Sequence, residues 1–320
     1  MKQLQHRWDY IYCLPTFLVI GSQRCASTYL QRTLELHPEI TLVPKERRFF
    51  SNKIRKDSIS SYSQLFIEAG KNKNDGLTSV RGEIDPSYAV LRLEEIAIVK
   101  ELIPELKIIL IVRNPLERLL SNIGRGWRFH YLDGRNSKSR NIFALLRKVD
   151  SNLSYRFTDY YKIYKNWVYF YGEENILIET YDNIKNNPKY VLEKCCSFLE
   201  VSSQISNLIP NDVLNKKQNT SSSCYESEIP HLLKWYLAKK WLPKVFQFQA
   251  NMNIDCSSWI KSMSNYSQEG KFYYYVIILI HYIYFLIPYR IFHKLYNAIR
   301  IPVKVHKIRN NLKSQIANIN

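Results

Sequence analysis

Apolar and polar positions near the start of the chain predict a strand, a tight turn and a helix in close succession. Residues 17–20 are a short run of Phe, Leu, Val and Ile, which favour strands, and the run ends at Gly21. From residue 28 to residue 36 the apolar positions instead follow helical spacing. The two segments are so close that the turn between them must be tight.

A second unit of the same kind lies further along the chain. Residues 107–112, with the sequence KIILIV, form a continuous apolar run typical of a strand inside a parallel sheet. Asn114 can cap a helix and Pro115 suits its first position, so a helix is expected to begin there. The two units predict an α/β protein with a parallel sheet flanked by helices. Both turns would lie at the carboxyl edge of that sheet, where such folds bind ligands.

The first turn has the chemistry of an anion site. Backbone N–H groups at the start of a helix have no partner within the helix and lie at the positive end of its dipole. Arg24 adds a formal positive charge there, and Ser27 and Thr28 add hydroxyl groups. The turn lacks the Gly-Lys pair of a Walker A loop, since Ala26 and Ser27 occupy those positions. Taken alone, it is equally consistent with an ordinary strand–helix connection that carries a surface arginine.

The second turn carries another candidate pair. Arg113 is expected at the carboxyl end of its strand, and Ser121 about two turns into the following helix. Each residue also has a simpler interpretation: a salt bridge from Arg113 to Glu117, and a solvated hydroxyl at Ser121. The meaning of either residue therefore depends on both turns together.

Together the two turns resemble the sulfotransferases that use 3′-phosphoadenosine 5′-phosphosulfate (PAPS). The segment GSQRCAST is similar to the family's 5′-phosphosulfate loop, and RNPLERLLSN to its 3′-phosphate motif, an Arg followed eight residues later by Ser. The resemblance covers residues 17–201, more loosely to Trp259, and is greatest to heparan sulfate glucosaminyl sulfotransferases and their bacterial relatives. Further segments follow the family's order: LELHPEI, KERRFF, GEIDPSY, IPELKIILIVRNP, ENILIETYDNI and NNPKYVLEKCCSFLEV. The resemblance implies a P-loop-like sulfotransferase fold and an enzyme that uses PAPS as co-substrate and no metal.

The resemblance also implies roles for individual residues. Arg24 would contact the 5′-phosphate and the oxygen bridging to sulfur, stabilising charge as the sulfuryl group leaves. Arg113 and Ser121 would bind the 3′-phosphate, because a planar guanidinium can hold two oxygens at once. Glu46, in KERRFF, would be the general base that takes the proton from the acceptor. The set implied to hold the donor is Gly21, Ser22, Gln23, Arg24, Cys25, Ala26, Ser27, Thr28, Arg113 and Ser121.

The chain departs from the family pattern at several positions. Ala26 stands where a Gly is frequent, so the loop must approach the phosphate without the backbone freedom of glycine. Ile84 stands where the heparan sulfate branch has a Lys that assists catalysis. Arg47 and Arg48 either supply the missing positive charge or meet an anionic acceptor.

Glu46 has an alternative interpretation as well. It is flanked by basic residues, and a carboxylate there could be paired with Lys45 or with one of the two arginines that follow it. In that case the base would lie elsewhere, and His37 or His130 would be the next candidates.

The acceptor is expected to be a carbohydrate or glycolipid, modified at a hydroxyl in preference to an amine. The net charge of +18 indicates an anionic partner. Within the basic stretch 125–148, Trp127, Phe129 and Tyr131 suit stacking on sugar rings, and a solvated loop and helix is the alternative. Nucleic acid is not expected, because no recognisable reading module accompanies the charge.

Length and composition predict one catalytic domain over residues 1–262 and an appendage over 263–320. The N-terminus has neither an apolar run before Tyr10 nor a cleavage signature, so no secretory signal is expected. The six cysteines lack metal-ligand spacing, and Cys195 and Cys196 are adjacent, which favours reduced thiols and a cytoplasmic protein.

The appendage contains the longest apolar run. Residues 272–287 read FYYYVIILIHYIYFLI and are followed by seven Lys or Arg residues between positions 290 and 320, with no Asp or Glu. The run is shorter than the ~20 residues that a spanning helix needs, and Tyr prefers the membrane interface. We expect attachment to an anionic membrane surface. Docking of this segment on the catalytic domain is the equal alternative, and a membrane span is the less favoured one.

Two other functions fit parts of the sequence. A P-loop nucleotide kinase would use the first turn, but needs a Lys before the Ser or Thr and a carboxylate for Mg²⁺, and the turn supplies no such Lys. A non-catalytic, membrane-associated nucleotide-binding protein would explain the tail and the missing Lys at position 84.

The tail generates the first prediction. Each basic residue close to an anionic bilayer contributes roughly 1 kcal/mol, so the full chain should sediment with anionic liposomes at low salt and be released at high salt. A chain ending at Ser264 should stay in solution and retain activity on a small acceptor. Aggregation of the shortened chain would instead mean that residues 272–287 complete the core, and resistance to alkaline extraction would mean a membrane span.

Overall fold

The computed structural model describes residues 13–53, 59–71, 78–132, 148–204, 209 and 231–267, with backbone alone at 52–53 and 124–132. The chain divides into two compact units, Met1–Ser264 and Asn265–Asn320. The first unit contains the sheet. The apolar run at 272–287, the basic tail and most of the stretch proposed as an acceptor surface lie outside the described residues.

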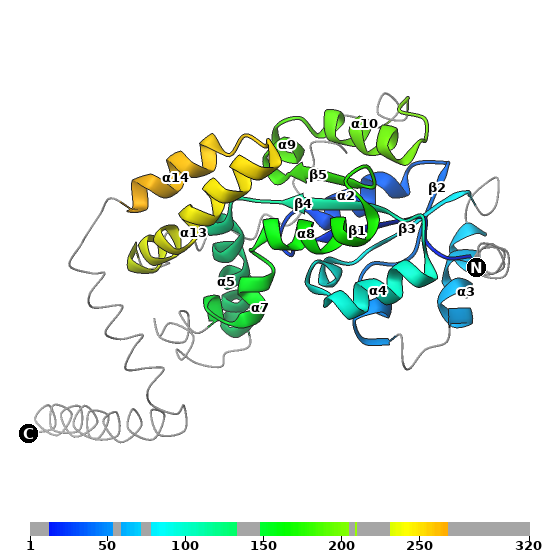
Figure 1. Cartoon of the computed structure of the whole chain (residues 1–320), viewed down its shortest axis with the longest axis horizontal. Helices are drawn as coiled ribbons and strands as arrows, with labels where there is room; N and C mark the ends of the chain where they lie inside the picture. Colours follow the sequence, from blue (N-terminus) through cyan, green and yellow to red (C-terminus); the bar gives the residue numbers. More distant parts are fainter. Residues whose placement is uncertain are drawn as a thin grey trace, which may run out of the picture. The chain divides into compact units, whose positions relative to one another are not determined.

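A parallel five-stranded sheet forms the centre of the first unit (Figure 1). Its strands, in spatial order, are β2 (Ile40–Leu42), β3 (Val80–Ile84), β1 (Phe17–Gly21), β4 (Lys107–Val112) and β5 (Ile176–Thr180). All four neighbouring pairs run parallel. The expected α/β fold, with a parallel sheet flanked by helices, is confirmed.

Helices connect the strands and cover both faces of the sheet. They are α2 (Ser27–Glu35), α3 (Ile59–Gly70), α4 (Leu93–Leu102), α5 (Pro115–Leu132), α7 (Asn152–Arg156), α8 (Tyr160–Tyr171), α9 (Tyr181–Asn186), α10 (Pro188–Leu199), α13 (His231–Met252) and α14 (Ser257–Ser267). Short helical turns also occur at Phe49–Lys53 and Pro86–Val90. None of the helices within the described ranges combines the length and hydropathy that a membrane crossing requires.

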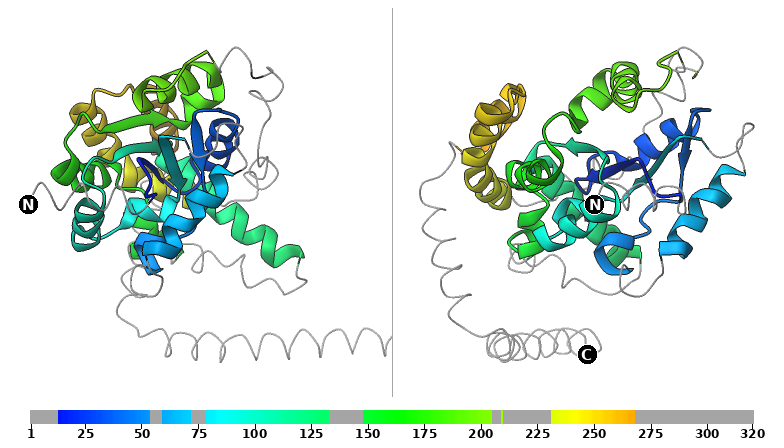
Figure 2. Two further views of the ribbon diagram at one scale, coloured as in Figure 1. Left: turned by 90° about the vertical axis from the view of Figure 1, so that its right-hand side faces the viewer. Right: turned by 45° about the vertical axis from the view of Figure 1, so that its right-hand side comes forward.

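Successive strand residues supply two different cores, since their side chains point to opposite faces. Phe17, Val19, Ile109 and Ile111 pack in one cluster with buried residues of α2 and α10. The intervening residues of β1 and β4 are also fully buried, and α4 and α8 pack together on that side (Figure 1). α13 packs against α5 and α8 (Figure 2). Because both faces are covered, β1 and β4 read as the continuous apolar runs that predicted them.

Phe17 and Gly82 fix the register between β1 and β3. The two residues are direct partners across the strands, and the Phe17 ring is fully buried. A Cβ atom added at Gly82 would lie only 2.2 Å from the Phe17 ring. The ring therefore occupies the space of the missing side chain, and a larger residue at either position would overpack the core.

The chain order of the strands places a ligand edge at the ends of β1 and β4. From β1 the chain moves outward to β2 and back to β3, and then crosses β1 to reach β4. Open α/β sheets bind ligands at such a switch point, outside the carboxyl ends of the strands. α5 starts there as expected: the Asn114 side chain accepts a hydrogen bond from the Leu116 N–H at 3.0 Å and caps the helix before Pro115.

Two buried carboxylates at the end of β3 hold the segment that follows β2. Glu83 accepts a hydrogen bond from the Arg47 N–H at 3.0 Å, and Asp85 accepts one from the Arg48 N–H at 2.8 Å. The second oxygen of Glu83 accepts from the hydroxyls of Tyr62 at 2.5 Å and Tyr88 at 2.9 Å. Burial raises the pKa of Glu83 to about 7, despite these hydrogen bonds.

The buried Glu83 should make stability depend on pH. The folded chain holds a proton there between about pH 4.3, the ordinary Glu pKa, and about 7, whereas the unfolded chain does not. The free energy of unfolding should therefore fall as pH rises from 5 to 8, and Glu83→Gln should flatten that slope. Urea unfolding at several pH values measures this dependence of the free energy of unfolding on pH. Glu68→Gln, at an exposed site in α3, is the matched control, and an unchanged slope in Glu83→Gln would contradict the assignment.

Candidate functional site

The loop between β1 and α2 has the backbone shape of an anion site. Gly21 has a φ of +123°, and an added Cβ would lie 3.0 Å from the Pro86 carbonyl oxygen, so this position requires glycine. Arg24 and Ala26 adopt positive φ values of 69° and 66°. Alternation of backbone conformation turns successive N–H groups toward one side, as in phosphate-binding nests. Ala26 thus takes the left-handed conformation without being glycine, at a cost of roughly 1–2 kcal/mol.

The side chains of this loop divide into two groups. Ser22 is buried and its hydroxyl donates to the Phe157 carbonyl at 2.5 Å, and Cys25 is fully buried. Burial raises the pKa of the Cys25 thiol to about 11, so it is protonated at neutral pH. Gln23 is half-buried, and its carbonyl accepts a weak hydrogen bond from Cys25. These three residues contribute backbone to the loop, and the charged and hydroxyl groups come from Arg24 and the start of α2.

Arg24 connects the two turns that the sequence singled out. Its Nε donates a hydrogen bond to the Ser121 hydroxyl at 3.0 Å, across the gap between the first loop and α5. Arg113 lies beside the same loop, with one guanidinium nitrogen 3.4 Å from the Arg24 carbonyl oxygen. The structure thus brings Arg24, Arg113 and Ser121 together, as a single binding site for the sulfuryl donor would require.

Arg113 is also held by α5 and by the start of α9. It forms the ion pair with Glu117 that the sequence offered as its simpler interpretation, at 3.0 Å, and its guanidinium lies 4.1 Å from the centre of the Tyr181 ring. The Arg113 side chain is 12% exposed, so it can still reach a ligand. Its ion pair and its place beside the loop are compatible with each other, and its role toward a 3′-phosphate stays a prediction.

Glu46 lies on the segment between β2 and the turn at Phe49–Lys53. Its N–H donates to the Ile84 carbonyl at 3.2 Å, and both Glu46 and Arg48 have positive φ, at 62° and 58°. The Glu46 side chain is 47% exposed, and one of its oxygens lies 3.7 Å from the Lys45 ammonium. An exposed carboxylate on an anchored backbone is suited to accept a proton from a bound molecule.

Lys45 is a residue of the site that the sequence interpretation had missed. Its ammonium donates to the hydroxyls of Ser27 at 2.8 Å and Thr28 at 2.9 Å, at the start of α2. The available signal was position: Lys45 follows β2 as Arg24 follows β1, and both strands end at the same edge of the sheet. His37, the alternative base, lies past the other end of α2, fully buried and hydrogen bonded to Ser202 and Glu39. The side chain of His130 lies outside the described residues.

Arg118 is a second such residue, placed behind the loop. Its side chain is fully buried, and it donates to the Ser154 carbonyl at 3.1 Å and to the Thr158 hydroxyl at 2.5 Å. Among the residues that the structure describes, its Nε and its other terminal nitrogen have no hydrogen-bond partner. Burial lowers the pKa of Arg118, although the group stays protonated at neutral pH. The signal in the sequence was its spacing of three residues before Ser121 on one helix, which puts both on one face.

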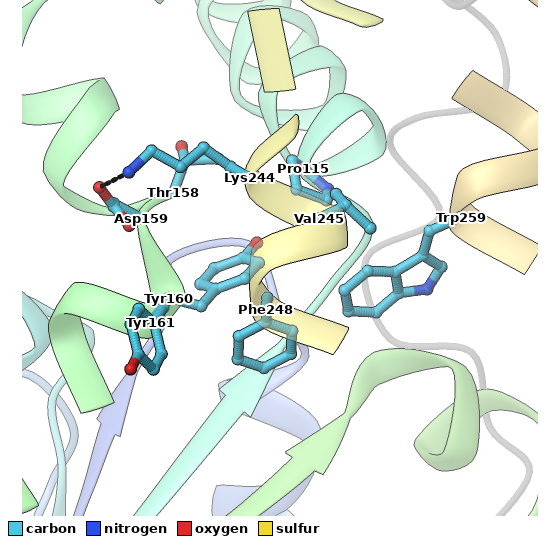
Figure 3. Close-up of a pocket in the computed structure, with 9 residues that line it drawn as sticks. All are labelled: Pro115, Thr158, Asp159, Tyr160, Tyr161, Lys244, Val245, Phe248 and Trp259. Atoms are coloured by element: carbon cyan, nitrogen blue, oxygen red, sulfur yellow. Dashed lines mark ion pairs between the residues drawn. The ribbon is translucent and has the colours of Figure 1, made fainter. Parts of the chain in front are cut away.

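α13 and α14 close over the start of α5 and α8. Figure 3 shows the small pocket between them, lined by Pro115, Tyr160, Phe248 and Trp259 among others, with Lys244 reaching to Asp159. That ion pair measures 3.1 Å, and the Tyr160 hydroxyl donates to the Arg113 carbonyl at 2.7 Å. Because Tyr160 packs against Phe248, its hydrogen bond helps to fix the backbone of Arg113. Within the described ranges there is no group of three or more His, Cys, Asp or Glu side chains arranged to hold a metal ion.

Known proteins resemble the chain both in sequence and in fold. The kil1 protein of Dictyostelium discoideum, a membrane-associated sulfotransferase, is 30% identical over 111 residues, which is 35% of this chain and 23% of that protein. The match thus spans less than a quarter of that relative. A sulfotransferase crystal structure from Alicyclobacillus acidocaldarius is 21% identical, with a TM-score of 0.55 over 77% of this chain and 98% of the other. The latter likeness supports the fold.

The family pattern described as "Sulfotransferase domain" matches residues 14–261. The match begins just before β1 and ends within α14, so it includes both turns, the segment of Glu46 and the helices that close over α5. The chain therefore belongs to the sulfotransferase family.

Proposed function

We propose that this protein transfers the sulfuryl group of PAPS to a hydroxyl, or less favourably an amine, of a carbohydrate or glycolipid acceptor. The observation that carries the proposal is the convergence of three segments at one sheet edge: the loop of Arg24, the segment of Glu46 and the start of α5. They supply cations, hydroxyl groups, helix N-termini and an exposed carboxylate. Donor binding and proton removal require just these groups.

The donor would lie across the two turns. The loop N–H groups with Arg24, Ser27 and Thr28 would bind the 5′-phosphosulfate, and Arg113 with Ser121 would bind the 3′-phosphate. The Arg24–Ser121 hydrogen bond supports this arrangement because it brings the two phosphate positions within reach of one another. The guanidinium of Arg113 would exchange part of its contact with Glu117 for the phosphate.

In the transfer step, a new bond forms from the acceptor oxygen to sulfur while the bond from sulfur to the 5′-phosphate oxygen breaks. Glu46 takes the proton of the acceptor hydroxyl, because a neutral hydroxyl is a poor nucleophile. The bonding electrons leave with the phosphate oxygen, where Arg24 stabilises the added charge. The products are the sulfated acceptor and 3′,5′-bisphosphoadenosine.

The acceptor would meet the protein at a membrane surface. The kil1 relative is membrane-associated by its name, and the chain carries a net charge of +18. A basic protein is attracted to anionic lipid headgroups, and a glycolipid would present its sugar at that surface. We therefore propose a cytoplasmic protein that binds a membrane peripherally.

The 3′-phosphate role of Arg113 can be tested without an acceptor. Arg113→Ala should weaken binding of 3′,5′-bisphosphoadenosine by about 1.5–3 kcal/mol, the value of a hydrogen bond to a charged group, and affect adenosine 5′-monophosphate much less. Calorimetry with both nucleotides measures the difference. Arg32→Ala, at an exposed site in the last turn of α2, is the matched control. Equal losses for the two nucleotides would remove Arg113 from the role.

The role of Glu46 is tested by turnover. Glu46→Gln keeps the size of the side chain but cannot accept the proton, so transfer should slow on the order of 10²–10⁴-fold while donor affinity persists. Labelled PAPS with octyl glucoside, a soluble glycolipid analogue, provides the assay. Glu68→Gln should retain the wild-type rate. A Glu46→Gln variant that turns over normally would place the base elsewhere.

A further inference from the structure

Lys45 occupies the space between the donor loop and the candidate base. Its ammonium lies 2.8 Å and 2.9 Å from the hydroxyl oxygens of Ser27 and Thr28, and 3.7 Å from a carboxylate oxygen of Glu46. The Lys45 side chain is 21% exposed, so it is neither a solvated surface group nor sealed in the core. A group moving from a phosphate at the loop to an acceptor oxygen at Glu46 must pass this ammonium.

The backbone of Lys45 is fixed from both sides. Val43 donates to the Gly82 carbonyl at 3.2 Å and Glu46 to the Ile84 carbonyl at 3.2 Å, which continues the pairing of β2 with β3 beyond Leu42. The next two N–H groups are bound by Glu83 and Asp85. Hydrogen bonds to β3 and to the residues that follow it thus fix where the backbone of Lys45 lies.

We propose that Lys45 is a catalytic residue that binds the oxygens of the sulfuryl group during transfer. This inference rests on the proposed function. It also accounts for the lysine that the heparan sulfate branch has where this chain has Ile84. Ile84 is fully buried, so its position cannot present a charge to the site, whereas Lys45 at the end of the neighbouring strand can. In this chain the segment after β2 would supply the positive charge that the heparan sulfate branch has on β3.

The donor chemistry of an ammonium explains how Lys45 would act on two groups at once. An ammonium only donates hydrogen bonds, so the Ser27 and Thr28 oxygens accept from Lys45. Each hydroxyl then keeps its own hydrogen to donate to a 5′-phosphate oxygen. Lys45 stays protonated throughout: the acceptor proton goes to Glu46, the electrons of the broken sulfur–oxygen bond go to the 5′-phosphate, and Lys45 offsets charge on the sulfuryl oxygens between them.

A binding experiment isolates the contact to the sulfuryl group. PAPS and 3′,5′-bisphosphoadenosine differ only by that group, so Lys45→Ala should lower affinity for PAPS on the order of 10- to 100-fold more than affinity for the bisphosphate. Calorimetry without acceptor measures both. Lys45→Arg should restore part of the difference, and Lys239→Ala, at an exposed site in α13, should change neither affinity.

Turnover provides the second readout. With octyl glucoside as acceptor, Lys45→Ala should reduce kcat on the order of 10²–10³-fold, and added ethylamine should recover part of the rate by replacing the lost ammonium. Equal loss of affinity for both nucleotides, with no rescue, would reduce Lys45 to a structural support of the loop and overturn this inference alone. If the wild-type chain binds neither nucleotide, the proposed function itself fails.

Discussion

The carboxylates at the end of β3 are the contacts on which the site depends. Glu83 and Asp85 accept the N–H groups of Arg47 and Arg48, and so determine where the segment after β2 can lie. That segment carries Lys45 and Glu46, with two residues in the left-handed conformation that only firm anchoring would maintain. Removing one carboxylate would take away the partner of an N–H group of this segment and free the segment to move away from the loop.

A second set of contacts holds the opposite side of the loop. Residues 154–160 receive hydrogen bonds from Ser22 and Arg118 and give one, through Tyr160, to the Arg113 carbonyl. The aromatic side chains of α13 and α14 cover this segment from outside. The loop is thus held between two supports that come from distant parts of the sequence. Rigid support of this kind is what precise placement of a reacting group requires.

Local signals in the sequence were enough to predict two of the five parallel strands, β1 and β4, and the helices that follow them. The strand at 107–112 and the helix start at Pro115 were placed correctly, since an apolar run and an Asn cap act over neighbouring residues. The first strand and helix differ from expectation by one residue at their ends, where helices and strands are least defined.

Contacts between strand ends could not be predicted in the same way. The hydrogen bonds of Lys45 to Ser27 and Thr28 depend on β2 and β1 ending at one edge with β3 between them, which is a property of the strand order. The burial of Arg118 likewise depends on α7 and the residues that follow it lying beside α5. Ala26 adopts a positive φ despite its side chain, a conformation that depends on the whole loop and not on the residue itself.

The buried guanidinium of Arg118 has an effect that reaches beyond its own contacts. Its charge acts on Cys25 inside the loop, where it favours the ionised thiol, and it opposes the charge of Arg113. In a low-dielectric interior such a field is weakly screened, so it adds to the positive potential over the loop at a distance. Charged residues at the rim would draw an anion in from solution, and this effect weakens as salt rises. Arg118 instead sets the part of the attraction that salt weakens least.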